Sequence, residues 1–151
     1  MIKPTVLPVL IGLFLIISGC GQDPASGRGF RLPDGDAEEG RQVFLYMQCN
    51  QCHTVAGMAL PAVAGADPPY VELGGNITRV KNYGELVTSI INPSHKLANG
   101  YAKERVSENG ESNMYVYNRH MTVQELIDLV AFLQSRYRIV PPPFDYRVYP
   151  R

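Results

Sequence analysis

Five consecutive residues, Cys49-Asn50-Gln51-Cys52-His53, constrain this chain more than any other part of its sequence. Two thiols three positions apart on one helical turn can add to the two vinyl groups of a single porphyrin, and the histidine that follows is placed to ligate the iron. A zinc site would need a second pair of ligands, and a thioredoxin-like dithiol would need a neighbouring βαβ pattern. The sequence has neither, so the motif predicts one covalent c-type haem bound by Cys49 and Cys52, with His53 as the proximal iron ligand.

The remaining cysteine, Cys20, ends an apolar N-terminal segment. Lys3 precedes an apolar run from Val6 to Gly19, which is shorter than the ~20 residues that a membrane-spanning helix needs. The run is typical of a secretory signal peptide. Its last residues, Ile17-Ser18-Gly19-Cys20, resemble the lipobox of bacterial lipoproteins. That resemblance implies cleavage before Cys20 and lipidation of its thiol; the alternative is an ordinary secretory signal in which this cysteine has no role.

The residues just before the CxxCH motif predict a helix. Asp36 and Glu39 stand at capping-box spacing, and acidic side chains are favoured at the positive end of a helix dipole. The predicted helix runs from about Ala37 to Gln48 and places Gly40 and Phe44 on one face.

Two further amphipathic helices are predicted later in the chain. Apolar residues recur at i, i+3, i+4, i+7 and i+8 between Tyr83 and Ile91. A capping box at residues 122–125 begins the third helix, whose apolar positions continue to Tyr137. The prolines at 141–143 prevent its continuation.

A first helix that leads into CxxCH and a last helix with a matching aromatic residue resemble the class I cytochrome c fold. Gly40 and Phe44 match the family's crossing residues in the first helix, and Phe132 lies in the last helix. The resemblance implies an all-α fold whose terminal helices cross around one covalent haem. Phe132 would then stack near Phe44, and the missing side chain of Gly40 would let the two backbones approach closely. Phe44 and Cys49 are separated by one residue more than in the mitochondrial members of the family.

The sequence accordingly divides into four segments. We expect a lipoprotein signal peptide at 1–19, a lipidated flexible tether at 20–35, a cytochrome c domain at 36–139 and a Pro/Tyr-rich tail at 140–151.

The family usually completes the iron coordination with a methionine, and three of the four candidates have another explanation. Met47 lies in the first predicted helix, and Met58 is only five residues beyond His53. Met121 precedes the N-cap of the last helix, where it forms a hydrophobic staple with Leu126.

Met114 is the methionine without such an explanation. It lies in a polar, irregular segment and stands fifteen residues before Leu129, which is close to the family's spacing. The family often has a proline after the axial methionine, whereas this chain has Tyr115. The resemblance therefore implies Met114 as the sixth ligand, with His120 and then His95 as alternatives, and Met121 stays open.

The resemblance implies an electron carrier rather than an enzyme. We expect it to pass single electrons between redox proteins on the periplasmic side of a bacterial membrane, held by its lipid anchor, with no small-molecule substrate. The 14 basic and 14 acidic residues balance, which removes the electrostatic basis for binding nucleic acid. The alternatives are a haem subunit of a periplasmic oxidoreductase complex, for example in sulfur oxidation, or a peroxidase-like or gas-sensing haem protein. The choice between inner and outer membrane stays open.

Overall fold

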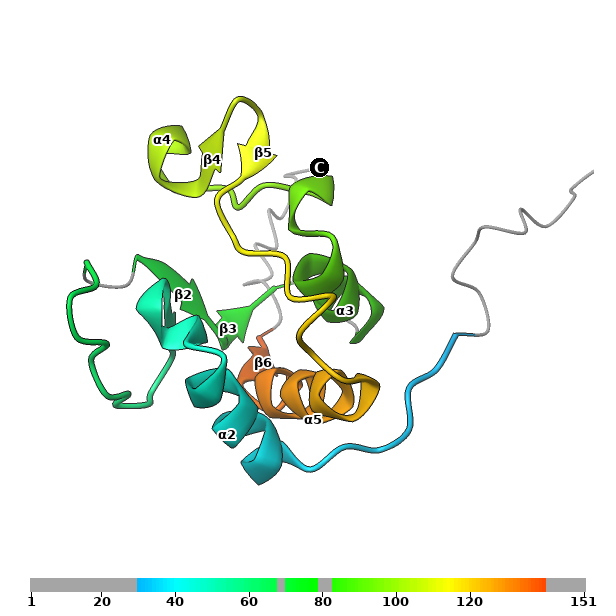
Figure 1. Cartoon of the computed structure of the whole chain (residues 1–151). Coiled ribbons are helices and arrows are strands. Elements are labelled where there is room, and N and C mark those ends of the chain that lie inside the picture. The colour runs from blue at the N-terminus through cyan, green and yellow to red at the C-terminus, as the bar shows by residue number, and fades with distance from the viewer. Residues whose placement is uncertain (1–29, 68–69, 79–82, 141–151) are drawn as a thin grey trace, which may run out of the picture. The chain divides into compact units, whose positions relative to one another are not determined.

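The computed structural model describes residues 30–67, 70–78 and 83–140, and the residues from Arg31 onward belong to one compact unit. The predictions for the signal peptide, Cys20 and the tail from residue 141 lie outside the described residues. In chain order the helices are α2 (Ala37–Tyr46), α3 (Tyr83–Ile91), α4 (Lys103–Val106) and α5 (Val123–Gln134), with 3-10 turns η1 (Cys49–Gln51) and η2 (Pro93–His95) (Figure 1). The strands are β1 (His53–Val55), β2 (Val71–Leu73), β3 (Gly75–Ile77), β4 (Ser107–Glu108), β5 (Glu111–Ser112) and β6 (Tyr137–Ile139). None of the helices in the described ranges is long and apolar enough to cross a membrane.

Helix α2 begins where the acidic cluster predicts. The Asp36 carboxylate accepts hydrogen bonds from the backbone N–H groups of Glu38 and Glu39 at 2.7 and 3.1 Å, which satisfies two of the free donors of the first turn. The helix ends at Tyr46, two residues earlier than expected, because Gln48 has a left-handed φ of 56°. A helix cannot continue through that conformation.

Helix α5 begins at the predicted capping box but ends sooner than expected. The Thr122 hydroxyl accepts from the Glu125 N–H at 3.2 Å, and the Glu125 carboxylate accepts from the Thr122 N–H at 2.7 Å. The prediction that the helix reaches Tyr137 is wrong, since α5 stops at Gln134. Tyr137 belongs instead to β6, which pairs in parallel with β3, so a backbone ladder to a distant strand replaces the last helical turn.

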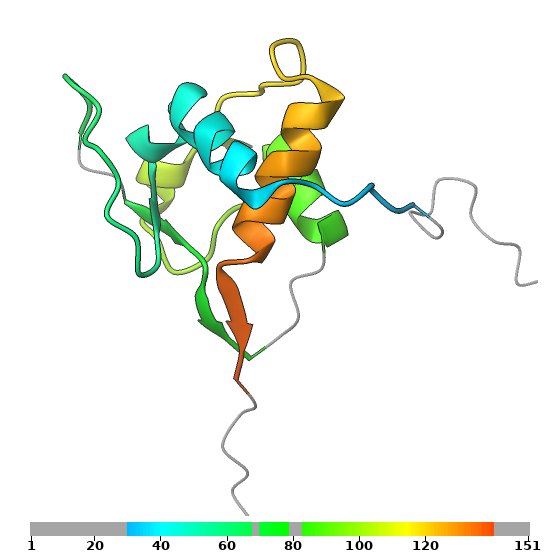
Figure 2. The same ribbon diagram turned by 90° about the horizontal axis from the view of Figure 1, so that it is seen from below.

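The crossing of α2 and α5 is the closest helix contact of the fold, as predicted (Figure 2). A Cβ on Gly40 would lie 1.9 Å from the Asp128 carbonyl oxygen and 2.8 Å from the Phe132 Cβ. Only glycine permits this approach. The rings of Phe44 and Phe132 pack beside it with centroids 5.7 Å apart and planes inclined by 59°.

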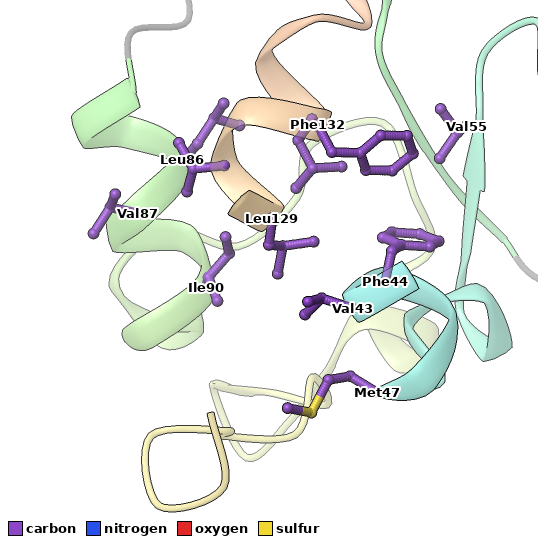
Figure 3. Packing of buried hydrophobic residues seen from close by; sticks show 11 residues of the cluster. Val43, Phe44, Met47, Val55, Leu86, Val87, Ile90, Leu129 and Phe132 are labelled. Carbon is purple, nitrogen blue, oxygen red and sulfur yellow. The ribbon is translucent and has the colours of Figure 1, made fainter. Parts of the chain in front are cut away.

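The core extends from this crossing to α3, whose bounds are those predicted. Figure 3 shows Leu86 and Ile90 of α3 on the side toward Leu129 of α5, while Val55 of β1 lies on the opposite side, beyond the two phenylalanine rings. The side chains of Phe44, Phe132 and Leu129 are the largest fully buried groups. The amphipathic faces of three helices therefore form one continuous core.

Three small two-stranded sheets accompany the helices, so the all-α class is not confirmed. Strands β1 and β2 pair in parallel, as do β3 and β6, and β4 and β5 form an antiparallel hairpin. Positive φ values of 51° and 86° at Asn109 and Gly110 give this hairpin its tight two-residue turn. The other two sheets depend on Gly74, at φ 85°, where a Cβ would lie 2.9 Å from the Arg136 Cβ.

Candidate functional site

The two cysteines of the motif share a single 3-10 turn. Cys49 opens η1, and the Cys52 N–H donates to the Cys49 carbonyl at 3.2 Å, which closes the turn. Both thiols are free and half-buried. The left-handed Gln48 separates this turn from α2. The predicted arrangement of two thiols on one turn is thus confirmed, on a short helix of its own.

His53 follows the turn as the first residue of β1, opposite Val71 of β2. Burial lowers the pKa of its imidazole, and the backbone of Val71 acts in the opposite direction. The neutral ring is the form that ligates a metal. Its Nδ1 atom is buried without a hydrogen-bond partner among the described residues. An unpartnered buried nitrogen next to two free thiols fits a covalent haem.

Burial also acts on the first cysteine. It raises the pKa of the Cys49 thiol to about 11, although a hydrogen bond to its own backbone opposes the shift. The side chain packs against the hydrophobic core. This thiol is consequently protonated at neutral pH and lies against apolar surface, which suits contact with a porphyrin edge.

Asn50, between the two cysteines, is a site residue that the sequence analysis did not single out. Only 6% of its surface is exposed, and its Nδ2 donates to the Pro61 carbonyl at 2.8 Å. The bond ties the cysteine turn to the loop after β1. It also engages the carbonyl of Pro61. The identity of the variable residues in CxxCH carried no signal for this role.

Tyr70 is a second residue of this kind. The pKa of the Tyr70 hydroxyl is raised, first by partial burial and then by the neighbouring Cys52, with which this hydroxyl forms a hydrogen bond. Its backbone N–H donates to the Cys52 carbonyl at 3.1 Å, and the Arg105 guanidinium lies 5.1 Å from its ring centroid. Tyr70 thus links the second cysteine to α4.

The four methionines of the described residues separate into two groups. Met47 is buried in the core, as predicted, and Met58 and Met121 are half-buried and pack against it. Met114 is also half-buried but lies outside this cluster, in the segment between β5 and α5. A half-buried thioether that the core does not use is available as a ligand.

The two alternative nitrogen ligands are on the surface. His95 is exposed, and its Nδ1 lies 2.8 Å from the Asn92 carbonyl. His120 is exposed as well, with its ring centroid 5.9 Å from that of Tyr115.

A groove of about 320 Å³ lies where the end of α2 faces the segment after Met114. It is lined by Tyr46, Met47, Gln48, Tyr115, Tyr117 and His120. The pKa of Tyr117 is raised, first by burial and then by Cys49 and Cys52, so this tyrosine lies beside the cysteine turn. Its position gives no periodic signal in the sequence, because it lies in an irregular segment.

One comparison with known proteins gives a match. A family model described as Cytochrome c matches residues 37–136 of the 151. Neither a curated protein nor a solved structure matches the chain. The matched residues span α2, the cysteine turn, Met114 and the whole of α5.

Proposed function

This chain belongs to the cytochrome c family, a family of haem-based electron-transfer proteins, and we propose that it is a monohaem electron carrier held by lipid on the periplasmic side of a bacterial membrane. We propose Cys49 and Cys52 as the attachment points of the haem and His53 and Met114 as its axial ligands. Its partners are other redox proteins.

The observation that carries this proposal is the cysteine turn and the histidine that follows it. Cys49 and Cys52 project from one closed 3-10 turn, and the half-buried His53 follows immediately, with a buried Nδ1 atom that has no hydrogen-bond partner among the described residues. The α2–α5 crossing fixes one side of this unit, and the β1–β2 ladder fixes the other. Three potential bonding groups are therefore held in place before any cofactor is considered.

Met114 supplies the sixth ligand in this proposal because packing leaves it free. The other three methionines of the described residues contribute to the core, and Met114 does not. When bound, a haem with histidine and methionine ligands supplies a one-electron couple at a potential that the methionine raises.

The lipid anchor is the part of the proposal that depends on sequence alone. The Ile17-Ser18-Gly19-Cys20 segment supports lipidation at Cys20, and acyl chains bind a membrane without a spanning helix. Cys20→Ser is expected to move the protein from the detergent phase to the soluble periplasmic fraction. If this variant stayed in the membrane, a protein partner rather than lipid would be the anchor.

Covalent attachment is tested by haem staining after denaturing electrophoresis. The wild-type band should retain one haem per chain, and the Cys49→Ser/Cys52→Ser variant should lose it. Release of the wild-type haem by acidified organic solvent would contradict thioether attachment.

The sixth ligand is tested by the absorption spectrum of the oxidised protein. Met114→Ala should remove the thioether-to-iron charge-transfer band, lower the reduction potential and open a site for cyanide. Met121→Ala is the matched control, and its spectrum should be that of the wild type. If the wild type lacks this band and neither variant changes the spectrum, bis-histidine ligation is favoured and His120→Ala is the next variant to measure.

A further inference from the structure

The segment that carries Met114 has no regular secondary structure and no proline after the methionine. It connects β5 to α5, and Figure 1 shows it passing α3 on the way. A proline would restrict φ at the position that Tyr115 occupies. Something else must therefore determine the path of this segment.

Two neighbouring side chains bind it to two different helices. The Tyr117 hydroxyl donates to the Met47 carbonyl at 2.9 Å. The Asn118 side-chain amide donates from Nδ2 to the Ile91 carbonyl at 2.8 Å. Met47 is the C-cap of α2 and Ile91 is the last residue of α3, so both acceptors belong to helix ends whose carbonyls lack helical partners.

Tyr117 also connects the segment to α5. Its carbonyl accepts from the N–H groups of His120 and Met121 at 2.8 and 3.0 Å, in the turn that precedes the Thr122 cap. Its ring packs against the core and meets the Tyr115 ring edge-on, with centroids 4.9 Å apart. One residue thereby links the ends of α2 and α5 three positions after Met114.

The other side of Met114 is held within the segment and by α4. The Met114 N–H donates to the Ser112 hydroxyl at 3.2 Å, and the Asn113 N–H donates to the Val106 carbonyl at 3.0 Å. Met114 thus lies between two groups of hydrogen bonds. The group on its carboxyl side, made by Tyr117 and Asn118, is the one that reaches α2 and α3.

We infer that Tyr117 and Asn118 are positioning residues for the sixth ligand, which hold the Met114 segment through the free carbonyls at the ends of α2 and α3 and limit how often the thioether leaves the iron. The inference rests on the proposed function, in which Met114 is that ligand. Tyr117 has the larger effect, because its bond is half-buried whereas that of Asn118 is exposed to water.

The experiment measures the rate of cyanide binding to the oxidised, haem-loaded full chain, since cyanide enters only when the sixth position opens. Tyr117→Phe removes one hydroxyl and should raise this rate about fivefold, the change in population that corresponds to one ordinary hydrogen bond. Asn118→Ala should raise it about twofold, as expected for an exposed bond. The charge-transfer band should remain in both variants, because the ligand itself is intact.

Two control variants separate positioning from general loosening of the fold. Tyr115→Phe makes the same chemical change in the same segment, on an exposed tyrosine, and should leave the cyanide rate unchanged. Asp36→Ala removes the cap at the opposite end of α2 and should lower the unfolding midpoint without raising the rate. If Asp36→Ala raised the cyanide-binding rate as much as Tyr117→Phe does, the inference would be overturned, because general loosening of the fold would then explain both increases.

Failure of the inference is distinguishable from failure of the proposed ligand. If Met114→Ala removes the band while Tyr117→Phe and Asn118→Ala bind cyanide at the wild-type rate, Met114 is the ligand and the positioning role is refuted. If Met114→Ala keeps the band, the ligand assignment is wrong and the inference falls with it. If Tyr117→Phe does not load haem, the cyanide-binding rate of Asn118→Ala alone tests whether these residues position Met114.

Discussion

The helix crossing and the Met114 segment hold the molecule together by opposite means. At the crossing, Gly40 and Phe132 are in contact over surfaces that leave no room for another atom. In the segment from 113 to 121, position depends on single hydrogen bonds such as those of Tyr117 and Asn118. Close packing resists any change of volume, whereas one hydrogen bond contributes only about 1 kcal/mol. Stability should therefore depend on the crossing, and the exchange of the sixth ligand on the segment.

The largest effect is expected at the centre of the crossing. Phe132 is 0% exposed, and Phe132→Ala should lower the free energy of unfolding by about 4 kcal/mol through lost burial and the remaining cavity. Denaturant unfolding of the oxidised protein measures this. Val123→Ala, at a position 71% exposed on the same helix, is the control and should change little. If Phe132→Ala lowered the free energy of unfolding only slightly, the α2–α5 crossing would contribute less to stability than its close packing suggests.

A somewhat smaller loss is expected when an atom is added to the crossing. Gly40→Ala places a Cβ against the backbone of Asp128, so α2 and α5 must separate, at a cost of about 3 kcal/mol. Gly57→Ala serves as the comparison, because φ is 70° there but nothing lies within 4 Å of the added atom. That variant reports backbone strain alone, about 1 kcal/mol. Equal losses in the two variants would rule out crowding as the reason for glycine at position 40.

The smallest effect is expected where the two regions meet. Met121 packs against the core just before α5, and Met121→Ala should cost on the order of 1 kcal/mol while leaving the charge-transfer band intact. Thermal unfolding and the oxidised spectrum are measured on the same sample. Loss of the band together with unchanged stability would identify Met121, and not Met114, as the ligand.

The parts that sequence analysis predicted are those with a local or periodic signal. The capping box at Thr122 and the bounds of α3 each follow from residues within one or two helical turns of each other, whereas the close approach at Gly40 was implied by the resemblance to the class I cytochrome c fold. The CxxCH turn is equally local. The local features correspond to periodicity and capping, which can be recognised in a single sequence.

The parts that were missed depend on contacts between residues far apart in the chain. Strand β6 exists because β3 offers it a parallel backbone edge, and a three-residue strand has no period to detect. The bond from Tyr117 to the Met47 carbonyl joins residues 70 positions apart, and its acceptor is a backbone group that every residue possesses. Gln48 adopts a left-handed conformation that glycine or asparagine would have signalled and glutamine does not.

The point at which the chain enters the compact unit has a mechanical consequence. The Asp36 N–H donates to the buried Asp128 carboxylate at 2.8 Å, and Gln124 holds the same carboxylate at 3.0 Å. Gly35 runs so close to α5 that a Cβ there would lie 2.6 Å from the Ile127 carbonyl oxygen. A pull on the chain ahead of α2 is therefore transmitted first to the middle of α5, through the Asp36–Asp128 hydrogen bond and the close contact at Gly35. If the proposed lipid anchor at Cys20 holds the amino end, a force on that segment would reach α5 before it reached the residues proposed to bind the haem.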